Sequence, residues 1–110
     1  MKSCLLLFFL LLGCASAKMD VPEWLQQKLL QAERKPGTYE EVWIYQYQGS
    51  KVYYFLPPCC DKFTELYDRN GKLLCKPGGG ITGKGDGACR DFYRKRKDGQ
   101  LFWRVPRLID

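Results

Sequence analysis

The residues of this chain that could do chemistry are its cysteines and one dense group of cations. The 110-residue sequence holds six Cys, 18 Lys and Arg against 12 Asp and Glu, and no His. Without an imidazole, His-assisted serine and cysteine nucleophiles, histidine general bases and His-ligated zinc are excluded. We expect no catalytic residue, no metal and no cofactor, and interpret the chain as non-enzymatic.

The densest group of cations is the run from Arg94 to Lys97. Residues 18–89 carry 10 Lys+Arg and 9 Asp+Glu, whereas residues 90–110 carry 7 and 3, so the C-terminal end is the basic one. Such a run can attract anionic lipid, polysaccharide or nucleic acid. A solvated hairpin edge and a dibasic processing site are the alternatives. The residues that we expect to face an anionic partner are Arg94, Lys95, Arg96, Lys97 and Arg104.

The first 17 residues have the pattern of a secretory signal peptide. Lys2 precedes an apolar run over residues 5–12, and small residues follow, ending in Ala15-Ser16-Ala17. Cleavage there leaves residues 18–110 as one domain, secreted and without a transmembrane segment. Leu11-Leu12-Gly13-Cys14 also matches a bacterial lipoprotein box, which would retain Cys14 as a lipid anchor.

Cys4 and Cys14 lie in this signal, so the mature chain keeps four cysteines. An even number in a small exported domain predicts two disulfides. Adjacent Cys59 and Cys60 rarely pair, because that bridge strains the peptide between them. Two connectivities remain open, Cys59–Cys75 with Cys60–Cys89, and Cys59–Cys89 with Cys60–Cys75. A zinc site is the competing interpretation, but the paired C-x-x-C spacing is missing.

The glycine-rich segment 77–87 contains fragments of two nucleotide motifs. Gly78, Gly80 and Gly83 match a dinucleotide fingerprint, but no parallel strand precedes them and no helix follows. Gly78, Gly83 and Lys84 match a P-loop until Gly85 replaces the Ser or Thr that binds magnesium. We expect no nucleotide, and a tight loop with several positive-φ glycines tied down at Cys75 and Cys89. Asp68-x-Asn70-Gly71 likewise resembles part of a calcium loop but is explained by a turn.

An amphipathic helix is expected from about residue 21 until before Pro36-Gly37. Asp20 and Glu23 have the spacing of a capping box, with Pro22 in the first turn. The apolar stripe of this helix consists of Val21, Trp24, Leu25, Lys28, Leu29 and Ala32.

Two aromatic runs, 42–48 and 51–57, predict a hairpin turning at Gly49-Ser50. The implied register pairs Gln48 with Lys51, Tyr47 with Val52, Tyr45 with Tyr54 and Trp43 with Leu56. One face then carries Trp43, Tyr45, Tyr47, Val52, Tyr54 and Leu56, and the other carries Val42, Ile44, Tyr53, Phe55, Gln46 and Gln48. One face must cover the helix; we expect the C-terminal hairpin, with Phe92, Phe102 and Trp103, to close the other. The face near Gln46, Gln48 and Tyr53 should be the wetter one.

Asn70-Gly71 and Asp98-Gly99 predict two further hairpins with type I′ turns. The second would place Arg94 opposite Trp103 and Phe92 opposite Val105, so that the Arg94 guanidinium lies on the indole face. The expected fold class is α+β, an N-terminal amphipathic helix packed on an antiparallel sheet of hairpins and stapled by two disulfides. A cystatin-like wrap of sheet around helix is one candidate topology, by analogy.

Several motifs resemble those of an uncharacterised family of small exported four-cysteine domains, many of them bacterial lipoproteins. These motifs are the Val42–Tyr54 run, Pro57-Pro58-Cys59-Cys60-Asp61, Glu65-Leu66-Tyr67-Asp68 with Asn70-Gly71, Cys75-Lys-Pro-Gly-Gly, Gly83-Lys-Gly-Asp-Gly and Cys89-Arg-Asp-Phe92. Arg90 stands where that family usually has Pro. The resemblance implies export, one domain and the four-cysteine framework, and no catalytic residue.

The sequence therefore predicts a secreted, non-enzymatic binding protein whose partner is an anionic surface or a protein. The alternatives are a protease-inhibitor-like protein and a cationic, membrane-active or toxin-like peptide.

Overall fold

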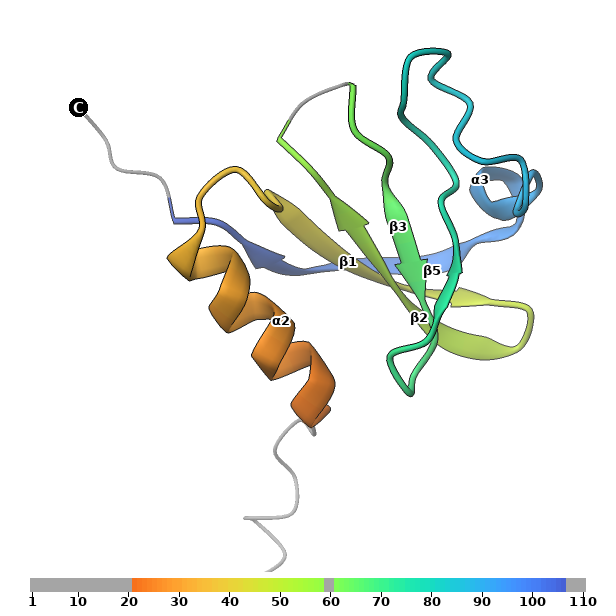
Figure 1. The fold of residues 1–110 in the computed structure, drawn as a ribbon. Coiled ribbons are helices and arrows are strands. Elements are labelled where there is room, and N and C mark those ends of the chain that lie inside the picture. Colours follow the sequence, from red (N-terminus) through yellow and green to blue (C-terminus); the bar gives the residue numbers. More distant parts are fainter. Residues whose placement is uncertain (1–20, 59–60, 107–110) are drawn as a thin grey trace, which may run out of the picture.

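The computed structural model describes residues 21–58 and 61–106, which form a mixed α+β fold with one five-stranded antiparallel sheet (Figure 1). The strand order is β4-β3-β2-β1-β5. The elements in chain order are α2 (Glu23–Arg34), β1 (Glu41–Tyr47), β2 (Ser50–Leu56), β3 (Glu65–Tyr67), β4 (Leu73–Cys75), α3 (Phe92–Lys95) and β5 (Lys97–Arg104). The α+β class and the antiparallel sheet are confirmed.

Helix α2 starts without a capping box. Its N-cap is Pro22, which has no side-chain cap hydrogen bond, and the Pro22 carbonyl accepts the amides of Leu25 and Gln26, each at 3.1 Å. Glu23 is thus the first helical residue rather than the third, so the predicted pairing with Asp20 is wrong. Asp20 itself lies outside the described residues. Leu25 and Ala32 of the predicted stripe are buried.

The β1–β2 hairpin turns one residue earlier than predicted. Tyr47 pairs with Ser50, Tyr45 with Val52 and Trp43 with Tyr54, so every predicted pair is displaced by two residues. Gln48 and Gly49 both have positive φ, 53° and 77°, as a type I′ turn requires. A shift of two residues leaves each side chain on its predicted face, because side chains alternate with a period of two.

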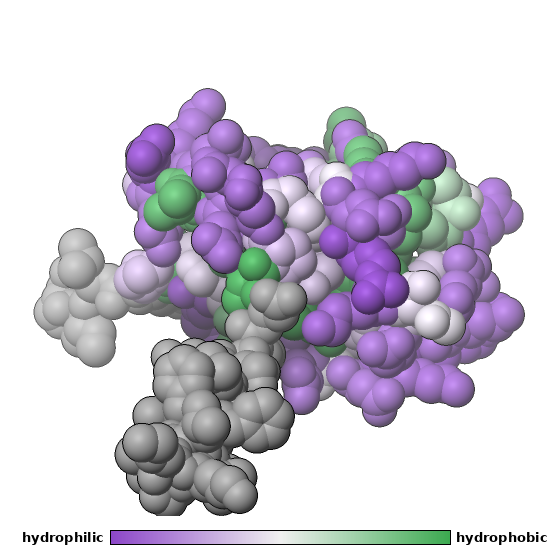
Figure 2. Space-filling view, turned by 90° about the horizontal axis from the view of Figure 1, so that it is seen from below, coloured by the Kyte–Doolittle hydropathy of each residue, from purple (hydrophilic) through white to green (hydrophobic). Residues whose placement is uncertain are grey.

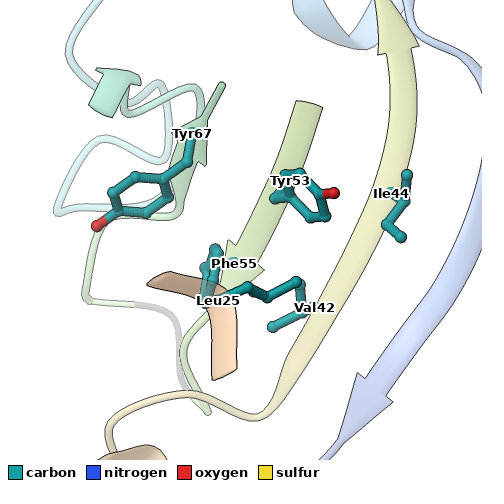
Figure 3. Close-up of a cluster of buried hydrophobic side chains, with 6 residues drawn as sticks. All are labelled: Leu25, Val42, Ile44, Tyr53, Phe55 and Tyr67. Atoms are coloured by element: carbon teal, nitrogen blue, oxygen red, sulfur yellow. The ribbon is translucent and has the colours of Figure 1, made fainter. Parts of the chain in front are cut away.

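The two faces of this hairpin form two separate cores. On one face, Leu25 of α2 packs into a cluster with Val42, Ile44, Tyr53, Phe55 and Tyr67 (Figure 3). Gln46 and Gln48 are exposed as expected, but Tyr53 is 3 % exposed, so the expectation that Tyr53 would lie on a wetter surface is wrong. Phe102 and Trp103 also pack on this helix-covered cluster rather than on the opposite face.

The second core is closed by Phe92 of α3, which is fully buried. It packs with Tyr47, Val52, Tyr54, Leu66 and Cys75. The predicted closure therefore comes from a short helix instead of a hairpin. With a cover on each face, β2 buries four consecutive residues, Val52 to Phe55, as a central strand does.

The β3–β4 connection is a three-residue loop, not a type I′ turn. The Gly71 amide donates to the Asp68 carbonyl, the Asp68 amide donates to the Lys72 carbonyl, and Gly71 has φ +87°. The Asp68 carboxylate accepts the amides of Asn70 and Lys72. This is a type I turn followed by a left-handed residue, and Asp68 serves the turn.

The predicted C-terminal hairpin does not exist. Residues 92–95 are helical, and residues 97–104 form one strand that pairs with β1. Trp103 therefore lies opposite Val42, and neither the Arg94–Trp103 pair nor the Phe92–Val105 pair forms. Instead of pairing with the strand predicted at 92–97, residues 97–104 pair along the free edge of β1.

Both predicted disulfide connectivities are wrong, because Cys75 pairs with Cys89 across 14 residues. Cys59 and Cys60 lie outside the described residues. The bridge closes the base of the glycine-rich segment, in which Gly79, Gly80, Gly83, Gly85 and Gly87 have the expected positive φ.

Seen from below the view of Figure 1, the surface is mainly hydrophilic, with apolar residues in separate small areas (Figure 2). Over residues 21–58 and 61–106, no helix is long and apolar enough to cross a membrane.

Candidate functional site

A groove of about 590 Å³ lies between the tip of the β1–β2 hairpin and the segment around α3. We call it the basic groove; its lining residues are Gln46, Tyr47, Gln48, Gly49, Asp91, Arg94, Lys95, Arg96 and Lys97. All four cations of the predicted run line it. The hairpin turn brings β1 residues to the same place as a segment more than 40 positions later in the chain.

Helix α3 holds this groove in position through its buried and polar anchors. Phe92 fills the second core, and the hydroxyl of Tyr47 donates to the Asp91 carboxylate at 2.5 Å. The Lys95 ammonium lies 3.6 Å from the other Asp91 oxygen. The back of the groove is therefore held in place by the buried Phe92 ring and by the Asp91 carboxylate, which is bound to Tyr47 and Lys95.

Arg96 is held by aromatic rings rather than by a carboxylate. Its guanidinium lies 5.0 Å from the ring centroids of both Tyr45 and Tyr93, and it donates to the Tyr45 hydroxyl at 3.2 Å. Such stacking keeps the charge and leaves the remaining guanidinium donors free to bind. The cation–π partner of the basic run is thus Arg96, not Arg94.

Arg94 and Lys97 are exposed, and within the described residues their side chains make no ion pair. The groove consequently presents two free cations beside a pre-positioned guanidinium, an arrangement suited to an anionic group. Neutral donors at the hairpin tip, the amides of Gln46 and Gln48, border the same space.

Arg104 does not belong to this site. It ends β5, roughly 20 Å from Lys97 at about 3.3 Å per strand residue. Its Nη2 and Nε donate to one Glu41 carboxylate oxygen at 2.7 and 3.0 Å. The structure therefore brings Arg94 to Lys97 together and separates Arg104 from them.

Sequence reasoning missed Asp91, Tyr47 and the hairpin-tip glutamines. One local signal was present, because Asp91 and Lys95 have the i, i+4 spacing of a helical ion pair. Nothing local connects Tyr47 with Asp91. Across the described parts of the chain, no three His, Cys, Asp or Glu side chains gather in a way that could hold a metal ion.

The chain belongs to the family described as Domain of unknown function (DUF6970), whose model matches residues 28–105. The match spans the sheet, the glycine-rich segment and the basic groove. Neither the curated proteins nor the solved structures contain a match to this chain.

Proposed function

We propose that this chain is an exported, non-catalytic binding domain that takes an anionic partner in the basic groove. Export rests on the signal-like residues 1–17, and the non-catalytic character rests on the lack of His in the sequence. The observation that carries the binding proposal is that Arg94 and Lys97 are exposed beside the stacked Arg96 and form no ion pair with any residue that the structure describes.

The competing interpretation, a solvated hairpin edge, fits this geometry less well. Arg94 and Lys95 lie on α3 and not on a strand, so they cannot protect a sheet edge from pairing. Four successive cations around one groove raise the local positive potential, which attracts anionic groups and repels cations. An anionic partner would reduce the electrostatic repulsion among these four side chains.

Retention on immobilised heparin, as a polyanion probe, tests the proposal. We expect the double variant Arg94→Gln/Lys97→Gln to elute at lower salt than wild type. If both side chains contact the polyanion, the slope of log affinity against log salt should fall by about 2, since each neutralised contact contributes close to one unit.

The matched control is Arg69→Gln/Lys72→Gln, which removes the same charge from the exposed β3–β4 loop. It should stay close to wild type. Equal losses in the two double variants would show that only net charge matters, and would refute a site at the groove.

A further inference from the structure

The glycine-rich segment carries an apolar side chain that nothing in the fold covers. Ile81 is 100 % exposed, whereas the other exposed large hydrophobic residues in the described parts of the chain are 41 to 45 % exposed. Single exposed apolar residues are common on soluble proteins, but complete exposure of an Ile is not. In Figure 1 the teal segment between β4 and α3 extends beyond the end of the sheet.

This segment is built rather than loose. The Gly83 amide donates to the Gly80 carbonyl and the Gly85 amide to the Gly79 carbonyl, each at 3.1 Å, and the Cys75–Cys89 bridge closes the base. Gly79 pairs with Phe63, and a Cβ at Gly79 would overlap the Lys62 carbonyl oxygen. The backbone around Ile81 is thus anchored at both ends, and its side chain is held outward.

A second apolar group lies beside the tip. Gly80, the neighbour of Ile81, packs against the Phe63 ring, where a Cβ would come within 2.8 Å of Cε1. Phe63 is itself 42 % exposed. We call Ile81 and Phe63 together the apolar tip.

Two lysines lie near this tip. The Lys76 ammonium lies 5.5 Å from the Phe63 ring centroid, and Lys84 pairs with Gly79. The acid of the segment, Asp86, is exposed, and its carboxylate accepts the amides of Lys76 and Ala88. Asp61, at the edge of the region, is an exposed acid. Ile81 is therefore the most exposed large apolar side chain of the described residues, and Lys76 and Lys84 lie in the same region of the fold.

We propose that the apolar tip docks the protein on an anionic membrane surface, with Ile81 entering the interface and Lys76 and Lys84 at the headgroups. Exposed apolar side chains with lysines beside them suit a bilayer interface, where acyl chains lie beneath anionic headgroups. This proposal uses a different surface from the basic groove and does not rest on it.

The test is co-sedimentation with vesicles of phosphatidylcholine containing a quarter phosphatidylglycerol. Wild type should bind, and Ile81→Ser should lower the partition coefficient about tenfold, the effect of losing one buried aliphatic side chain. Ile81→Leu should keep the binding, and salt raised from about 0.05 to about 0.5 M should weaken it. The matched control is Leu30→Ser, a similar change at an exposed residue of α2.

Because Ile81 is 100 % exposed, Ile81→Ser should leave the urea midpoint unchanged, so lost binding cannot be ascribed to unfolding. Wild type that does not bind these vesicles would overturn the proposal and favour a protein pocket as the partner of the tip. Binding that survives Ile81→Ser but is lost in Arg94→Gln/Lys97→Gln would also overturn it, since the basic groove would then carry the attachment.

Discussion

At the scale of single residues, Tyr47 connects the second core to the basic groove. Its ring is buried and its hydroxyl donates to Asp91. Burial, and then the hydrogen bond with Asp91, raises the pKa of Tyr47 to about 12. The same hydrogen bond, with help from Lys95, lowers the pKa of Asp91. Both pKa shifts reflect one hydrogen bond in the folded protein, from a neutral Tyr47 hydroxyl to an ionised Asp91 carboxylate.

This pair predicts a pH-dependent cost for Tyr47→Phe, measured by urea unfolding. Asp91 has a lower pKa folded than unfolded, so its contribution is complete above the unfolded value of about 3.9 and is lost as pH falls through the folded one. Wild type should therefore exceed Tyr47→Phe in stability at pH 6, and the gap should shrink at about pH 2. A gap that is the same at both pH values would contradict the pairing.

At the scale of elements, the Asp98-Gly99 dipeptide makes a β-bulge instead of a turn. Between the pairs Ile44–Gln100 and Gln46–Lys97, β5 has one more residue than β1. Asp98 takes the left-handed conformation, with φ 55°, and absorbs the extra residue. Gly99 lies against the Tyr45 ring, which a Cβ there would overlap. The bulge thus lies against the same ring on which Arg96 stacks.

A double-mutant cycle between Gly99 and Tyr45 tests this element. Gly99→Ala should destabilise the wild type by about 1 to 3 kcal/mol, because the added methyl group meets a packed ring. In the Tyr45→Ala background the same change should cost much less, since the obstacle is gone. Equal costs in the two backgrounds, from denaturant unfolding, would argue against the bulge and its contact.

At the scale of the whole molecule, one disulfide joins the sheet to the segment that carries the proposed apolar tip. Cys75 is 3 % exposed at the end of β4, and Cys89 precedes the helix that closes the second core. In the chain-entropy model, a loop of about 15 residues contributes roughly 3 kcal/mol. The bridge therefore supports the tip and the basic groove together.

Peptide mapping of the oxidised protein without reduction should recover a cross-link between Cys75 and Cys89. The double variant Cys75→Ala/Cys89→Ala should lose about 3 kcal/mol of stability, with reduced wild type as the comparison. A cross-link from Cys59 or Cys60 to either of these cysteines would contradict the pairing.

The sequence alone determined the features that depend on residues close together in the chain. The stripe that buries Leu25 and Ala32 follows from helical periodicity, and the two faces of the β1–β2 hairpin follow from strand alternation. The predicted faces of the hairpin are correct although the predicted position of the turn is wrong. Moving the turn by one residue shifts the strand pairing by two residues, which keeps every side chain on its face.

Only the tertiary structure decided the features that join distant segments. Locally, Asp98-Gly99 favours a hairpin, but residues 97–104 form a strand that pairs with the edge of β1. Phe92 lies in a short helix, and its side chain is fully buried in the second core. The same packing put Arg96 on Tyr45, 51 residues away, and Cys75 beside Cys89. These outcomes depend on which edges and cavities the rest of the fold leaves open, and burial of distant groups outweighs a local turn preference that is smaller in free energy.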